Sequence, residues 1–142
     1  MVWDVVLICF DVSSSKCYKH AKTQWLDEVQ KYYPNVPFIL VGLKKDERLG
    51  KGLRVPPLGQ LETRIPAAEG TFGAATMGAI KYLECSAKTG EGVNRVFTEA
   101  ARTVLDERAA EEETKKLAKE KGKEKERARG SGSNIASMLC FQ

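Results

Sequence analysis

Three short runs of mostly apolar residues dominate the hydrophobic pattern of the chain, and each has the length of a strand. They cover residues 5–10, 38–41 and 80–85, and the first two contain no charged or strongly polar side chain. Strands that are buried on both faces of a parallel sheet have this uninterrupted pattern, whereas a half-exposed strand alternates. The sequence therefore predicts two buried strands and a third strand at 80–85.

Apolar residues at helical spacing follow each of these runs. Ser13, Ser14 or Ser15 can cap a helix after the first strand. The apolar stripe predicted for that helix comprises Tyr18, Ala21, Trp25, Val29 and Tyr32. A short helix is predicted over 67–77. The clearest helical stripe lies after the third strand and comprises Val93, Val96, Phe97, Ala100, Ala101, Val104 and Leu105.

The order strand, helix, strand, helix, strand, helix predicts an α/β fold in which three parallel strands are flanked by helices. Residues 1–110 have this globular pattern, and residues 111–142 do not. Residues 47–66 hold three prolines and three glycines, which favours an irregular loop or insertion. We therefore expect one α/β domain and a basic, largely disordered tail, into which the last helix can continue.

Positive charge is concentrated in the tail. The chain has a net charge of +4, and the segment that begins at Lys115 and ends at Arg129 holds eight Lys and Arg against three Glu. Three interpretations stay open: a solvated extension of the last helix, a weak contact with an anionic membrane, and nucleic-acid binding. No aromatic residue stands among the basic ones, so nucleic acid is not the expected partner.

Several kinds of chemistry lack their residues in this sequence. The four cysteines, at positions 9, 17, 85 and 140, show no CxxC spacing, which is typical of a reduced intracellular protein without a zinc site. His20 is the only histidine, and no nucleophile pattern accompanies it. The phosphate-binding pattern GxxxxGK[ST] is absent. No catalytic or metal-ligating residue is therefore assigned.

Two loops that follow predicted strands carry the polar residues with the clearest chemistry. Lys44 and Asp46 follow the second strand, and Ser86, Ala87 and Lys88 follow the third. Ligands of open α/β sheets bind at the carboxyl ends of the strands, so both loops should lie at the same edge. A carboxylate such as Asp46 accepts two hydrogen bonds from a planar ring, the Ala87 N–H donates to a carbonyl oxygen, and lysine stems lie along a flat base. This set of donors and acceptors describes guanine.

Three longer stretches carry a family resemblance. They read DVVLICFDVSS at 4–14, WLDEVQKYYPNVPFILVGLKKDERL at 25–49 and YLECSAKTGEGVNRVFTEAAR at 82–102. They resemble the C-terminal part of a Rho-type small GTPase of the Ras superfamily. That family recognises guanine through [NT]KxD and SAK motifs, which fall here on Lys44, Asp46, Ser86, Ala87 and Lys88. Leu43 replaces the first letter of the first motif, which removes a side chain that would brace neighbouring loops.

The resemblance implies a partial P-loop small-GTPase fold and a guanine nucleotide, GTP or GDP, as the ligand. Family members begin with a phosphate-binding loop, two switch regions and a DTAG motif, none of which occurs in this sequence. Those parts hold the phosphates, Mg²⁺ and the attacking water. By this comparison the chain reads only the guanine moiety, and GTP hydrolysis and Mg²⁺ are implied by the family without assigned residues here.

The resemblance also bears on location. Rho and Ras relatives commonly end in a CaaX lipidation box that is preceded by basic residues. Cys140 is third from the end of this sequence instead of fourth, so lipidation at Cys140 is doubtful. No run approaches the roughly 20 apolar residues of a membrane span. We expect a cytoplasmic protein with peripheral contact at the inner face of the plasma membrane.

Two functions of different classes remain. The first is a Rho-family signalling switch that binds guanine nucleotide, represented by a chain that lacks the phosphate- and Mg²⁺-binding half and is inactive alone. Its partners would be the regulators and effectors typical of the family. The second is a non-catalytic protein-interaction module derived from a Rho GTPase, with the first helix and the 47–66 insertion as partner surfaces.

Overall fold

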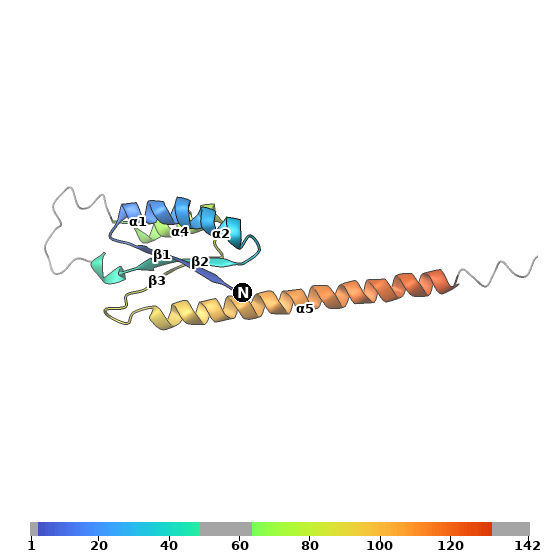
Figure 1. The fold of residues 1–142 in the computed structure, drawn as a ribbon. Helices are drawn as coiled ribbons and strands as arrows, with labels where there is room; N and C mark the ends of the chain where they lie inside the picture. The colour runs from blue at the N-terminus through green and yellow to red at the C-terminus, as the bar shows by residue number, and fades with distance from the viewer. Residues whose placement is uncertain (1–2, 49–63, 132–142) are drawn as a thin grey trace, which may run out of the picture. The chain divides into compact units, whose positions relative to one another are not determined.

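The computed structural model describes residues 3–48 and 64–131 (Figure 1). The chain divides into two units, Met1–Val104 and Leu105–Gln142, and each is described by itself. The first unit holds a three-stranded sheet with a hydrophobic cluster on each of its faces. Most of the predicted insertion and the whole segment around Cys140 lie outside the described residues.

The sheet consists of β1 (Val6–Asp11), β2 (Phe38–Leu43) and β3 (Lys81–Glu84). The strand order is β1-β2-β3, and both pairs are parallel. Val41 in the central strand lies opposite Cys9 on one side and Leu83 on the other. The predicted α/β fold with three parallel strands is therefore confirmed.

A helical layer covers one face of the sheet (Figure 1). It contains α1 (Ser15–His20), a π-helix η1 (Ala21–Trp25), α2 (Leu26–Tyr32) and α4 (Ala67–Met77). Ser14 is the residue that caps the first helix, because its side chain accepts a hydrogen bond of 3.3 Å from Cys17 N. The cluster under this layer includes Ile8, Phe10, Tyr18, Phe38, Leu40, Ala74 and Met77.

The π-helix shifts the buried stripe of this layer by one position. Regular α-helical spacing places Trp25 after Ala21 in the stripe, but a π turn contains an additional residue. As a result Leu26 packs against the core, whereas Trp25 is 53% exposed. Tyr32, seven residues after Trp25, is exposed as well. The predicted stripe was therefore wrong at these two aromatic residues.

The first turns of α5 (Val93–Ser131) cover the opposite face. Val96 and Ala100 belong to a buried cluster with Val41 and Leu83 of the sheet. The apolar stripe predicted for this helix is wider than the part that becomes buried, since Phe97 and Leu105 are about two-thirds exposed at 65% and 66%.

Two glycines allow α4 to approach the tyrosines of the neighbouring elements. A Cβ at Gly73 would lie 2.0 Å from Tyr18 Oη, and a Cβ at Gly70 would lie 2.2 Å from Tyr82 Cζ. Tyr18 Oη donates a hydrogen bond of 2.9 Å to the backbone oxygen of Glu69. The glycines in this helix are thus required by packing, although glycine lowers intrinsic helix propensity.

In the second unit, α5 continues through the basic segment to Ser131. Lys115 forms an ion pair of 3.2 Å with Glu111 one turn earlier, as expected for a charged, solvated helix. Among the residues that the structure describes, no helix is both long enough and apolar enough to cross a bilayer. The tail expected to be largely disordered comprised 111–142; α5 includes its residues up to Ser131, and residues 132–142 lie outside the described ranges.

Candidate functional site

Two loops meet at the carboxyl ends of β2 and β3. After β2, Lys44 adopts a left-handed conformation with φ 59° and ψ 42°, and a single 3₁₀ turn, η2 (Lys45–Glu47), follows. After β3, Cys85 N donates to Gly42 O at 2.9 Å and Cys85 O accepts from Lys45 N at 3.1 Å. The backbone of one loop is therefore fixed directly to that of the other.

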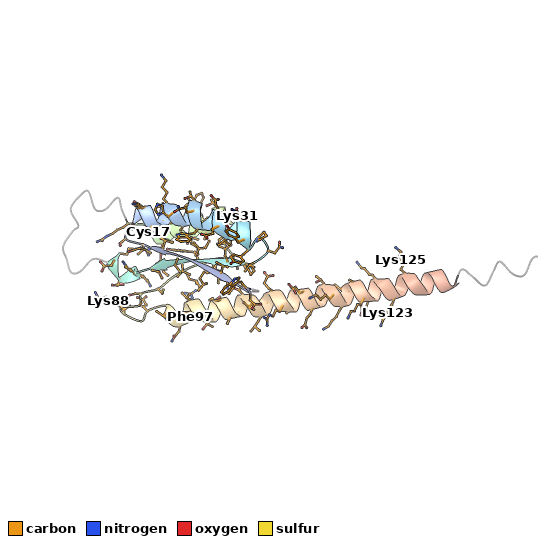
Figure 2. The ribbon with its side chains drawn as sticks, in the orientation of Figure 1. Cys17, Lys31, Lys88, Phe97, Lys123 and Lys125 are labelled. Atoms are coloured by element: carbon orange, nitrogen blue, oxygen red, sulfur yellow. The ribbon has the colours of Figure 1, made fainter. Side chains whose placement is uncertain are left out.

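The side chains of Asp46 and Ser86 join the loops a second time. Ser86 Oγ donates to Asp46 Oδ1 over 2.5 Å, and Ser86 is fully buried. Lys88 Nζ lies 4.0 Å from Asp46 Oδ2. Figure 2 shows Lys88 in the loop that connects β3 with α5. One carboxylate oxygen of Asp46 is thus held by the protein, and the other faces only the exposed Lys88 side chain among these contacts.

The loop after β3 is a compact turn. Gly90 N donates to Ser86 O at 2.9 Å, Ser86 N donates to Glu91 O at 2.9 Å, and Gly90 has a positive φ of 77° that favours glycine. Ala87 is exposed, and its N–H makes no backbone hydrogen bond within the described part of this turn. This N–H is consequently available to a ligand at the loop.

An ion pair between Lys45 and Glu91 connects the two loops at their surface. It adds to the Lys45 N–Cys85 O hydrogen bond, so Lys45 contacts the second loop through both its backbone and its side chain. An exposed ion pair of this kind contributes only up to about 1 kcal/mol. The loop arrangement therefore depends mainly on the backbone bonds and on the buried serine.

Asp11, at the end of β1, is a site residue that the sequence analysis did not single out. Its Oδ2 lies 2.6 Å from Lys44 Nζ, while Oδ1 accepts from the N and Oγ of Ser13 at 2.8 and 2.6 Å. Partial burial acts to raise the pKa of Asp11, but the bonds from Lys44 and Ser13 outweigh it and hold the pKa below its ordinary value. A charged residue at the carboxyl end of a buried strand was the available signal.

The Asp11 contact also changes the expectation for Lys44. The hydrogen bond to Asp11 raises the pKa of Lys44 above its ordinary value. The ammonium group is directed to the end of β1, so only the alkyl stem of Lys44 remains to contact a planar ligand. The side chain of Lys88 is about as exposed as that of Lys44, at 65% against 62%, but its ammonium group lies 4.0 Å from its nearest carboxylate oxygen, on Asp46, instead of 2.6 Å.

A second polar network lies beside the loops. Arg48 donates from two guanidinium nitrogens to the two carboxylate oxygens of Glu84 at 2.5 Å each, and Tyr82 Oη donates to Glu84 Oε1 at 2.6 Å. Arg48 also donates to Ile65 O at 2.9 and 3.1 Å. The network therefore ties the residues on either side of 49–63 to the end of β3.

Burial opposes ionisation of Glu84, but the hydrogen bonds from Arg48 and Tyr82 outweigh this effect and hold the pKa of Glu84 below its ordinary value. For Tyr82, burial and the neighbouring Glu84 carboxylate raise the pKa of the phenol. No sequence pattern indicated this network, because its members come from three separate segments.

The structure brings the predicted site residues of the two loops together at one edge of the sheet. Asp46 lies within contact distance of both Ser86 and Lys88, and Ala87 follows Ser86 in the same loop. In the described residues, no group of three or more His, Cys, Asp or Glu side chains is placed to hold a metal ion. The arrangement presents acceptors, an N–H donor and two lysine stems, which suits a planar heterocycle more than a metal.

Comparison with known families decides the classification. The sequence profile of the Ras family matches residues 2–106 of this chain. The chain belongs to the Ras family.

Curated relatives of this Ras-family chain are Rho-type GTPases. It is 41% identical to the GTP-binding protein RHO2 of Saccharomyces cerevisiae over 102 residues, which is 72% of this chain and 52% of RHO2. It is 40% identical to the Rho-related GTP-binding protein RhoB of Homo sapiens over 105 residues, 74% of this chain and 54% of RhoB. The chain therefore spans about half the length of the curated relatives that it matches. The Rho-type resemblance inferred from the sequence is confirmed.

Proposed function

We propose that this Ras-family chain carries the guanine-recognition half of a Rho-type signalling switch that binds GTP or GDP. The observation that carries the proposal is the 2.5 Å hydrogen bond between Ser86 and Asp46, which joins the two loops that bear the family motifs. We assign residues 1–110 to the GTPase domain and residues 111–142 to a basic tail. Regulators and effectors of the kind that act on Rho-type GTPases are the corresponding partners.

The proposed contacts follow from the donors and acceptors of guanine. Asp46 accepts hydrogen bonds from the ring N–H and the 2-amino group, and the Ala87 N–H donates to the 6-oxo group. The stems of Lys44 and Lys88 lie along the two faces of the ring. Adenine has an amino group at position 6 and no 2-amino group. It would cover the Ala87 N–H and the Asp46 carboxylate without supplying the matching hydrogen bonds, which costs about 1–3 kcal/mol for each group that the base removes from water.

We further propose that the phosphates and Mg²⁺ are held by residues outside the part of the family that this chain matches. Mg²⁺ and phosphate contacts supply most of the transition-state stabilisation in GTPases. The 142-residue chain should therefore bind guanine nucleotides weakly and should not accelerate hydrolysis. Phosphate release from GTP at the rate of buffer alone is the expected result, and a rate above that of buffer would contradict it.

Base recognition is tested by titrating the ¹⁵N-labelled chain with GDP and, separately, with ADP. The amide resonance of Ala87 should shift with GDP and remain in place with ADP. Asp46→Ala should abolish the GDP effect, and Asp27→Ala, which removes an exposed carboxylate on α2, should leave it unchanged. Equal responses to GDP and ADP would refute guanine recognition.

A second candidate function is the interaction module. It is favoured by the exposure of Trp25 at 53% and Tyr32 at 59% on the first helical layer. Aromatic side chains are enriched at protein interfaces. A Trp25→Ala variant that loses binding of a Rho effector while its GDP response is unchanged would support this function. If the variant still binds the effector, the surface around Trp25 does not serve as the interface.

We also propose that the basic segment of α5 contacts anionic lipid, which would hold a cytoplasmic protein at the inner face of the plasma membrane. The support is the charge of the segment that begins at Lys115, with eight cations against three glutamates. Juxtamembrane basic residues contribute roughly 1 kcal/mol each near an anionic surface. Lipidation of Cys140 is not needed for this contact.

A further inference from the structure

A groove of about 400 Å³ opens along the outer edge of β3, away from the guanine-motif loops. Its walls come from α4, from β3 and from the first turns of α5, all within the first unit. The lining residues include Thr71, Ala74, Ala75, Tyr82, Arg95 and Glu99. This volume is at the lower end of the range for ligand pockets, which is about 300–1,000 Å³.

The floor of the groove is an unpaired strand edge. β3 is the last strand in the order β1-β2-β3 of the described sheet. Cys85 N pairs with Gly42 O, and hydrogen-bonding residues alternate along a parallel strand. Leu83 therefore pairs with β2, and the backbone N–H and C=O of Tyr82 face the groove. Such an edge accepts an additional strand.

The two walls differ in chemistry. On the α4 side the lining side chains are small, Thr71, Ala74 and Ala75, which leaves room for an apolar side chain. On the α5 side, Glu99 pairs with Lys81 at 2.5 Å and with Arg102 at 3.3 Å.

Arg95 lines the same charged wall. Three cations thus surround a single carboxylate, and this wall has an excess of positive charge.

These walls lie on opposite faces of the sheet, because α4 packs with one hydrophobic cluster and α5 with the other. Successive side chains of an added strand point alternately to the two faces. We propose that the groove binds an extended peptide segment of a partner protein, in which apolar and acidic residues alternate, as an additional strand on β3. Apolar side chains enter the α4 side, and acidic ones contact Arg95 on the α5 side.

Charge complementarity decides between this occupant and a second copy of the chain. Pairing two copies through β3 would bring the cationic wall of one groove toward that of the other. An acidic strand neutralises the same excess charge. The length of β3, four residues or roughly 13 Å, sets the length of the paired segment.

The probe for the test is a capped heptapeptide that alternates valine and glutamate, added to the ¹⁵N-labelled 142-residue chain. Hydrogen exchange of the Tyr82 amide should slow at least about tenfold at saturation, while that of Leu83, already paired with β2, should change little. The matched control peptide has lysine in place of glutamate and should not slow exchange at Tyr82.

Variants separate the two walls. Arg95→Glu should weaken binding of the valine–glutamate peptide by about tenfold or more, as expected for loss of one charged contact and its replacement by repulsion. Lys16→Glu makes the same change of charge at an exposed position on α1 and should have no effect. Ala75→Phe fills the α4 side and should also weaken binding; Ala75 is exposed, so the chain should still fold.

The proposal is overturned by binding of the lysine peptide as strong as that of the glutamate peptide, or by an unchanged affinity in Arg95→Glu and Ala75→Phe. Slowing of the Tyr82 amide with rising chain concentration, without peptide, would identify a second copy as the occupant instead. If the Leu83 amide is not protected from hydrogen exchange in the free chain, β3 does not pair with β2 as described, and the proposal fails with it. None of these results depends on nucleotide binding, so the proposed function is judged separately.

Discussion

Ser86 donates a hydrogen bond from Oγ to Oδ1 of Asp46 over 2.5 Å, across 40 positions of the sequence. The same Oγ accepts from the N–H of Thr89 at 3.2 Å, and Ser86 is fully buried. One buried hydroxyl therefore fixes both the turn after β3 and the orientation of the carboxylate in the neighbouring loop. The site that we assign to guanine depends on this link more than on any surface ion pair.

Ser86→Ala should impair both stability and base recognition. It removes the donor to Asp46 and leaves the Thr89 N–H without its acceptor, so we expect a loss of about 1–3 kcal/mol in unfolding free energy. GDP affinity should fall by about tenfold because Asp46 is no longer held. Urea unfolding and GDP titration measure the two effects. Ser15→Ala, at an exposed serine that does not cap the helix, is the control, and an equal effect there would contradict this role.

Gly73→Ala should destabilise the domain, although alanine is the better helix former. Its Cβ would meet Tyr18 Oη at 2.0 Å, and relief of such overpacking costs typically about 1–3 kcal/mol. Gly122→Ala on the exposed part of α5, where nothing lies within 4 Å, should instead favour its helix by roughly 1 kcal/mol. Circular dichroism during thermal unfolding compares them. A Gly73 variant as stable as the parent would show that α4 does not pack as described.

The strands were predictable because their signal is local. The uninterrupted apolar run at 38–41 reflects a strand with helices on both faces, and the structure extends it only to Leu43. The predicted helix 67–77 also has the observed bounds. In each case the pattern of apolar and polar residues within a single segment is enough to predict the element and its approximate bounds.

The sequence-based predictions were wrong or incomplete where a tertiary contact determines which side chains are buried or paired. The π turn exposes Trp25 and lets the partly buried Leu26 pack against the core, and a pattern that assumes regular helical spacing does not predict it. In the candidate site, the sequence motifs had singled out both Asp46 and Ser86, which the structure joins by a hydrogen bond. Asp11 was missed, because its pairing with Lys44 joins the ends of two strands and is visible only when they lie side by side.

The pH dependence of stability should include a contribution from Glu84. Its pKa is below the ordinary value in the folded state, so its contribution is present at neutral pH and is lost as the pH falls through the folded pKa, below about 4.5. Glu84→Gln should cost about 1–3 kcal/mol at pH 7, because Arg48 loses its charged partner and keeps only neutral acceptors, and less at low pH. Urea unfolding between pH 7 and pH 3 measures this. Glu28→Gln, at an exposed position of α2, is the control for the substitution itself. If Glu84→Gln has the same pH profile as the parent, the network is not ionised as we describe.

Membrane contact should depend on the basic part of α5. Replacement of Lys115, Lys116 and Lys119 by glutamine should reduce co-sedimentation with phosphatidylserine vesicles about tenfold or more, since each basic residue contributes up to about 1 kcal/mol. Replacement of the three glutamates at 111–113 changes the charge by the same amount in the opposite sense and should strengthen binding. Binding should weaken as salt rises. Binding to neutral phosphatidylcholine vesicles that equals binding to the anionic ones would refute an electrostatic contact.

The base preference of an Asp46→Asn variant tests the central claim most directly. An amide can donate to the 2-oxo group of xanthine, whereas a carboxylate accepts from the 2-amino group of guanine. In competition experiments followed at the Ala87 amide, the parent chain should prefer GDP to xanthosine diphosphate, and Asp46→Asn should reverse that order. A variant that keeps the preference of the parent for GDP, or a parent that does not distinguish the two bases, would show that Asp46 does not read the base.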